Sequence, residues 1–175
     1  MKPGFPGHTN PQEFRTPTWA ERDTVCVVIH PELIDLQATP AVVTHHTTDA
    51  EHLTELFDEG FEALYTRLAA AGVAPTGAPF ARYLSVGEIF EVELGVPTSE
   101  ASSIPTVDLP ECQAARLRYV GPYEGLRDAC AQLFEWIGEY GRHPAGPFWE
   151  SYVTDPRTEP DPAKRITDIY VPLAG

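Results

Sequence analysis

Apolar positions along this chain follow two different periods, and the order in which these periods change predicts the fold. Segments rich in β-branched residues alternate with polar ones at a period of two, as half-buried strands do. Between them, Leu53, Phe57 and Leu64 belong to a series spaced by three and four residues, which indicates an amphipathic helix that ends at Gly72. The pattern predicts two strands at 25–29 and 37–47, a helix at 48–72 capped by Thr48 or Asp49, and two further strands at 79–86 and 88–96.

The same order of elements then recurs in the second half of the chain. After a polar connector at 98–108, the pattern predicts a strand at 111–121, a helix at 125–141 and two strands at 147–153 and 166–173. Segments 72–83 and 141–152 each leave a helix at glycine, pass a proline and a glycine, and begin a strand with Pro-Phe. The chain is therefore predicted to contain a duplicated strand–helix–strand–strand unit.

Two such units side by side predict an α+β domain with one antiparallel sheet and both helices on one side of it. We expect a ligand cleft at the pseudo-two-fold seam, on the concave side of the sheet that the helices leave free. The expected boundaries are 25–98 for the first repeat and 106–175 for the second, within one domain over 25–175. Residues 1–24 are proline-rich and without periodicity, so they are predicted to be a flexible arm.

Charge and cysteine content narrow the choice of partners. The net charge of −14 disfavours nucleic acid and anionic membrane and favours a cationic or neutral ligand. The cysteines are Cys26, Cys112 and Cys130, with no C-x-x-C spacing, which is typical of free thiols in a reducing compartment. We find no signal-like or membrane-spanning apolar run and predict a cytoplasmic location.

A carboxylate in the middle of an apolar strand is the main candidate for chemistry. Side chains alternate in a strand, so Phe148, Glu150 and Tyr152 are predicted to share one face, and Trp149 and Val153 the other. If that second face packs on a helix, Glu150 lies on the floor of an aromatic cup, a receptor suited to an amphipathic cation. A solvated glutamate, or one paired with Arg82 or Arg116, remains an equally good interpretation of the spacing alone. The predicted ligand-binding residues are Tyr83, Tyr119, Tyr123, Phe148, Trp149, Glu150, Tyr152 and Tyr170.

Other chemistries find little support in the sequence. His45 and His46 would point to opposite faces of a strand, so together with Asp49 and His52 they do not predict a metal site. No serine lies in a nucleophile elbow, no phosphate-binding loop occurs, and no cofactor is predicted. Cys130 is expected to be a buried, inert thiol, and residues 155–165 a solvated connection between two strands.

Several motifs resemble the GyrI-like effector-binding domain over about residues 25–175. They are YVGPYEGL (119–126), LFEWIGEYG (133–141), GPFWESYVTDP (146–156), TDIYVPL (167–173), PFARY (79–83) and FEVELGVPT (90–98). The resemblance implies the duplicated fold around a central cleft. It also implies that Glu150 meets cationic drugs, that Tyr83, Tyr152 and Tyr170 are pocket aromatics, and that Tyr123 lies at the rim. Regulators of this family carry a DNA-binding segment, which this sequence lacks, so a transcription role is not expected.

Three functions follow as hypotheses. The favoured one is a stand-alone protein that binds amphipathic, cationic aromatic ligands and confers resistance by sequestration or sensing. The second is a hydrolase of strained, cyclopropane-type toxins, as the resemblance implies for some family members, with Glu150 and Tyr152 as catalytic residues. The third is a protein partner that inhibits a DNA topoisomerase. It ranks last, because the acidic residues form no run that would mimic DNA.

Overall fold

The computed structural model describes residues 27–28, 30–99 and 103–175, so the predicted arm at 1–24 and Cys26 lie outside the described residues. The first half contains β1 (Val27–Val28), β2 (Glu32–Leu36), β3 (Thr39–Asp49), α1 (Leu53–Ala70), β4 (Phe80–Ser85) and β5 (Ile89–Pro97). The second half contains β6 (Val107–Leu109), β7 (Cys112–Val120), the 3-10 turn η2 (Tyr123–Gly125), α2 (Leu126–Glu139), β8 (Phe148–Tyr152), η3 (Pro162–Lys164) and β9 (Ile166–Pro172).

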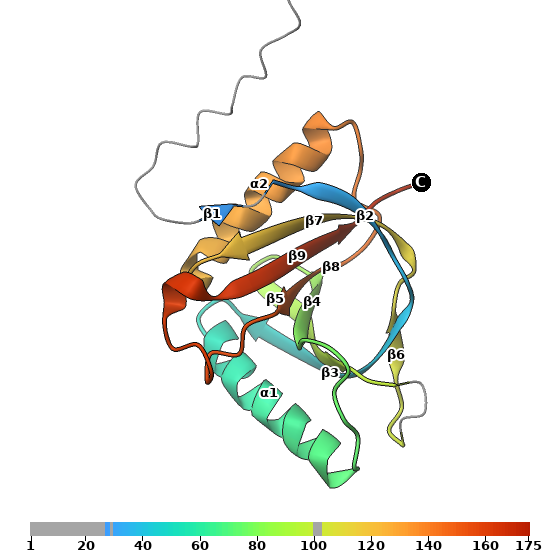
Figure 1. Ribbon diagram of the computed structural model, residues 1–175, viewed down its shortest axis with the longest axis vertical. Coiled ribbons are helices and arrows are strands. Elements are labelled where there is room, and N and C mark those ends of the chain that lie inside the picture. Colours follow the sequence, from blue (N-terminus) through green and yellow to red (C-terminus); the bar gives the residue numbers. More distant parts are fainter. Residues whose placement is uncertain (1–26, 29, 100–102) are drawn as a thin grey trace, which may run out of the picture.

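The strands form one antiparallel sheet that curls strongly (Figure 1). Its order is β1-β7-β9-β8-β4-β5-β3-β6, and β2 also pairs with β7. The unit β3-α1-β4-β5 is repeated as β7-α2-β8-β9, and the two units meet where β4 pairs with β8. The predicted α+β class and the duplicated order of elements are confirmed.

Two short strands were missed by the sequence pattern. β2 pairs with the outer edge of β7, and β6 pairs with the start of β3 although it begins inside the predicted polar connector. Both are short segments whose partners lie far away in the sequence. Their strand conformation therefore comes from tertiary pairing rather than from local periodicity.

Both helices begin slightly later than the sequence pattern predicts. α1 begins at Leu53, and Asp49 does not cap it directly; its carboxylate instead accepts hydrogen bonds from the backbone N–H groups of Glu51 and His52, both at 3.0 Å. α1 and α2 are followed by Gly72 and Gly141, with φ of 68° and 71°. This left-handed conformation suits glycine, so both predicted helix stops are correct.

The helices cover the outer parts of one sheet face and leave its middle open. α1 packs on β3 and β5, and α2 packs on β7. Leu133 and Ile137 of α2 form a core with Leu117 and Ile169. Leu64 of α1 is buried in a separate core within the first repeat. The central strands β4 and β8 therefore lie in the gap between the two helices, with side chains that are mostly buried or half-buried. Among the described residues, no helix is both long and apolar enough to span a membrane.

The opposite face of the sheet is closed rather than open. Curling of the sheet brings Ala41, Phe80, Leu109 and Trp149 into a buried cluster there. The expectation of a cleft on the face away from the helices is therefore wrong. The cleft lies on the helix side, because each helix packs over the outer strands of its own repeat and not over the seam.

Candidate ligand-binding site

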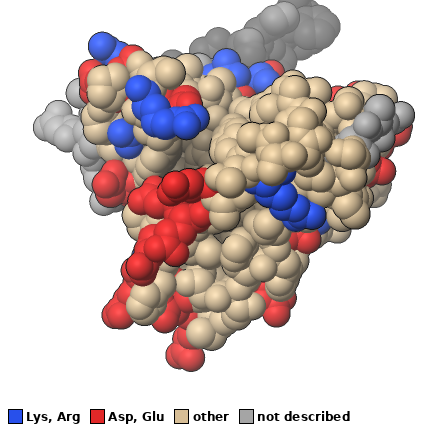
Figure 2. Space-filling view, turned by 90° about the horizontal axis from the view of Figure 1, so that it is seen from below, with Lys and Arg blue, Asp and Glu red and all other residues tan. Residues whose placement is uncertain are grey.

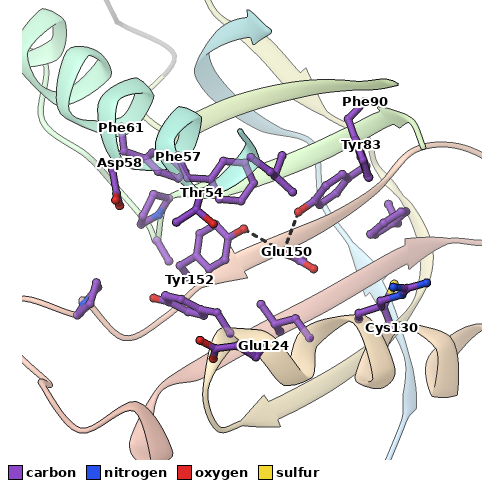
Figure 3. Close-up of a pocket in the computed structure, with 18 of the residues that line it drawn as sticks. Thr54, Phe57, Asp58, Phe61, Tyr83, Phe90, Glu124, Cys130, Glu150 and Tyr152 are labelled. Atoms are coloured by element: carbon purple, nitrogen blue, oxygen red, sulfur yellow. Dashed lines mark hydrogen bonds between the residues drawn. The ribbon is translucent and has the colours of Figure 1, made fainter. Parts of the chain in front are cut away.

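A cavity of about 1730 Å³ lies between α1 and α2, with the central strands as its floor. Four segments of the chain line it: α1, the β4–β5 hairpin, α2 with the preceding turn, and β8 with the residues that follow it. Figure 3 shows Glu150 in the middle of this cavity, with Asp58 and Glu124 on one side of it and Phe90 and Cys130 on the other.

Glu150 is a buried carboxylate that two tyrosine hydroxyls hold in place. Its side chain projects from the middle of β8, and the residue is only 6% exposed. The hydroxyl of Tyr152 donates to Oε2 at 2.9 Å, and that of Tyr83 donates to the same oxygen at 3.1 Å (Figure 3). No described side chain donates to the second oxygen, and no Lys or Arg among the described residues pairs with this carboxylate. Oε1 thus remains available to a ligand.

The surroundings favour the neutral form of Glu150 in the empty cavity. Burial raises the pKa of this carboxyl above its ordinary value, and the hydrogen bonds from Tyr152 and Tyr83 offset only part of that rise. Burial next to this carboxylate also raises the pKa of both tyrosine hydroxyls, so they remain donors. A cation in the cavity would restore the interaction that the charged carboxylate has lost on leaving water.

Aromatic rings surround the carboxylate on two sides. On the first side, the Tyr152 ring contacts Phe61 edge-to-face with ring centroids 5.9 Å apart, Tyr123 at 5.8 Å and Phe57 at 6.2 Å. The guanidinium of Arg165 lies 5.0 Å from the Tyr123 ring centroid. These rings come from α1, η2 and β8, so folding fixes the relative position of three separate chain segments.

On the second side, Phe148 is held between two rings. It stacks on Tyr83 with centroids 4.8 Å apart and an interplanar angle of 12°, and it contacts Phe134 edge-to-face at 5.6 Å. Cys130 also lines this side, where burial and then the charge of Glu150 raise the pKa of its thiol to about 12. Aromatic faces attract cations, by about 0.5–2 kcal/mol each depending on desolvation.

Carboxylates outnumber cationic side chains along the wall of the cavity. The lining contains six acidic residues and two arginines: Asp58, Glu62, Glu88, Glu124, Glu150 and Asp155, with Arg127 and Arg157. The charge of Arg157 is already matched by Asp155, to which its guanidinium donates at 2.7 Å. In the view from below (Figure 2), Asp and Glu side chains form a large group beside smaller groups of Lys and Arg, and further Asp and Glu side chains lie around the edge of this face. The field at the cavity mouth therefore favours cations.

Five of the eight predicted binding residues line the cavity, namely Tyr83, Tyr123, Phe148, Glu150 and Tyr152. Alternation along β8 placed three of them correctly on one face. The interpretation in which Glu150 pairs with Arg82 or Arg116 does not hold in this structure. Arg82 donates to Glu93 at 2.8 Å, and Arg116 pairs with Glu32.

Three predicted residues do not line this cavity. Trp149 and Tyr170 are cross-strand neighbours that stack on each other with centroids 5.4 Å apart, on the face opposite Glu150. The alternation of side chains along β8 and β9 places both rings on that face. Tyr119 is buried beneath the turn before α2, where its hydroxyl donates to the carbonyl of Pro122 at 2.8 Å. It thereby supports the turn that carries Tyr123.

Several lining residues were assigned other roles from the sequence. The sequence pattern places Phe57 only in the apolar series of a helix, and it predicts no binding role for Phe61 or Phe134, although all three line the cavity. Residues 153–157 also form part of the wall; they join the end of the predicted strand 147–153 to the start of the expected solvated connection at 155–165. Helical periodicity marked Phe57 and Phe61 as facing the sheet. It could not show that a cavity lies between these side chains and the central strands of the sheet.

The histidines that suggested a metal do not assemble one in the described part of the chain. A ring nitrogen of His46 lies 2.8 Å from the hydroxyl of Thr44, and Nδ1 of His52 lies 2.7 Å from Oδ1 of Asp49. No group of three His, Cys, Asp or Glu side chains suited to a metal ion occurs among the described residues. None of these histidines is among the described residues that line the cavity.

The fold agrees with comparison to known proteins. The family model of the GyrI-like small molecule binding domain matches residues 30–174, and the chain belongs to this family. No curated protein sequence matches the chain significantly.

Solved structures of low sequence identity share the fold. A cryo-EM structure of an EcmrR–DNA complex has a TM-score of 0.74 and 18% identity, over 82% of this chain and 57% of that chain. This chain thus spans little more than half the length of that protein. SAV2435 bound to tetraphenylphosphonium has a TM-score of 0.61 and 13% identity, over 84% of this chain and 95% of that one. A hydrolase from Listeria innocua has a TM-score of 0.60 and 13% identity, over 82% of this chain and 91% of that one. At these identities the likeness establishes the fold.

Proposed function

We propose that this protein binds lipophilic, aromatic monocations in the cavity between its two helices. The observation that carries the proposal is the buried Glu150 carboxylate, which has two hydroxyl partners on one oxygen and no cationic partner among the described residues. Such a group is costly when charged in an empty apolar site and is stabilised when a cation arrives.

The aromatic walls and the acidic lining support the same ligand class. Rings on both sides of Glu150 offer their faces to a desolvated cation, and the excess of carboxylates attracts it from solution. SAV2435, which shares the fold, is known with bound tetraphenylphosphonium, a lipophilic cation. Binding would serve to sequester or sense toxic compounds of this kind.

The test compares two probes of matched shape and opposite charge, tetraphenylphosphonium and tetraphenylborate, by isothermal titration calorimetry. We expect the cation to bind saturably and the anion not to bind, because the anion would meet Glu150 without compensation. Glu150→Gln should weaken cation binding at least tenfold, as expected for the loss of a desolvated charge partner. Asp128→Asn removes one negative charge from an exposed position of α2 that does not line the cavity, and it should leave the affinity nearly unchanged. Equal affinity for both probes, or an unaffected Glu150→Gln variant, would contradict the proposal.

A second candidate, a hydrolase of strained-ring electrophiles, is favoured by the raised pKa of Glu150 and its free oxygen facing the cavity. A carboxyl whose pKa is raised by burial can act as a general acid or base, and Tyr152 would hold it in position. Turnover of a substrate separates the two candidates. Mass spectrometry of a cyclopropane-bearing alkylator incubated with wild type and Glu150→Gln should show the hydrated product with wild type alone if the enzyme candidate is correct. An intact compound in both samples leaves the binding function only.

A further inference from the structure

The cavity has two chemically different ends, with Glu150 between them (Figure 3). We infer that its preferred ligands are elongated amphiphiles, with the cationic head at Glu150 and an apolar tail that leaves the cavity between the β4–β5 turn and α2. This inference rests on the proposed function and specifies the class of cation.

The first end lies where β8 ends and is acidic. Asp58 and Glu62 reach it from α1 and Glu124 from η2, and all three are exposed. An apolar tail placed along this end would remove water from carboxylates without offering them a partner. Since burying an unpaired charge is strongly unfavourable, this end does not suit a tail.

The second end lies where β8 begins and is mainly apolar. Phe148 and Phe134 form a continuous aromatic surface from the ring of Tyr83 outward. At the mouth, Val86 of the β4–β5 turn is 59% exposed and Phe134 is 36% exposed, and both line the cavity. Glu88 is the one carboxylate of the cavity lining in that turn. Covering these exposed apolar side chains is favourable in proportion to the area removed from water.

The size of the cavity agrees with an elongated ligand. Its volume of about 1730 Å³ exceeds the roughly 300–1,000 Å³ of a typical small-molecule site. A compact cation centred at Glu150 would leave the outer apolar end unfilled. An extended tail would fill the space along Phe148 and cover Phe134 and Val86 at the mouth.

Alkyltrimethylammonium ions with hexyl, octyl, decyl and dodecyl chains test this inference, below their micelle-forming concentrations. By calorimetry, the dissociation constant should fall about threefold to fourfold for each added methylene while the tail is buried. Tetraphenylphosphonium is titrated in parallel. If it binds but chain length has no effect, the inference is overturned and the proposed function stands. If none of these cations binds, both fail.

Two matched substitutions decide the direction of the tail. Val86 and Val153 are both exposed valines that line the cavity, at the apolar and the acidic end respectively. Val86→Ser should reduce the affinity for the dodecyl ion severalfold and leave the hexyl ion unaffected, and Val153→Ser should change neither. The reverse pattern, a loss with Val153→Ser alone, would overturn the assignment of the two ends. Neither position is buried, so both variants are expected to fold.

Discussion

Replacing the central carboxylate should make the empty protein more stable while it weakens ligand binding. In Glu150→Gln, the amide oxygen can still accept from Tyr83 and Tyr152, and the amide nitrogen can face the cavity, so the shape of the site is kept. What disappears is the charge, which is buried without a cationic partner among the described residues. We therefore expect a stabilising substitution at neutral pH.

Burial raises the pKa of Glu150, and this direction fixes the sign of the effect. Each unit by which folding raises a carboxyl pKa destabilises the charged protein by about 1.4 kcal/mol. The two tyrosine hydrogen bonds to a neutral amide are weaker than those to a carboxylate, which offsets part of the gain. We expect Glu150→Gln to increase the free energy of unfolding by about 1–2 kcal/mol in neutral buffer, in the lower part of the range found when buried charged groups are replaced by neutral ones.

The pH dependence has a definite sign. Between the unfolded pKa, near 4.5, and the raised folded pKa, the native state binds more protons than the unfolded state. The stability of wild type should therefore fall as pH rises through this window and level off above it. Glu150→Gln lacks this contribution, so the two proteins should be equally stable well below pH 4.5 and diverge above it.

Urea denaturation followed by tryptophan fluorescence, at a series of pH values from acid to mildly alkaline, measures this difference. Asp128→Asn controls for the general effect of one negative charge less in an acidic protein. A Glu150→Gln variant that is less stable than wild type at neutral pH would refute the reasoning. So would a difference between the two proteins that does not change with pH.

Two further predictions concern the partners of Glu150 and the floor of the sheet. Tyr83→Phe removes a donor to Oε2. The loss of stability should approach about 1.5–3 kcal/mol as rising pH ionises Glu150, and it should be smaller in acid; a loss in urea denaturation that does not change with pH would contradict this. In Gly95→Ala, the added Cβ would lie 2.2 Å from the ring of Phe80, which is buried on the neighbouring strand, so thermal unfolding should show a loss of about 1–3 kcal/mol or more. Gly146→Ala, where nothing lies within 4 Å of the added Cβ, serves as the control and should change the unfolding temperature little.

The local periodicities of the sequence were sufficient for the elements and for the composition of one strand face. Alternation in β8 grouped Phe148, Glu150 and Tyr152, and the repeated order of elements predicted the α+β sheet with both helices on one side. These are short-range properties, because side-chain direction along a strand is set by the backbone alone.

Tertiary structure decided which face of the sheet holds the cavity. A period of two shows which residues share a face, but not what covers that face. Alternation already placed Trp149 opposite Glu150, and only the structure shows that the face of Trp149 and Tyr170 is closed by a buried cluster. In the same way, the helical pattern of Phe57 and Phe61 is identical for a helix packed on a filled core and for one beside a cavity. The position of α1 and α2 over the outer strands, and the gap they leave above β4 and β8, depend on contacts between residues far apart in the chain.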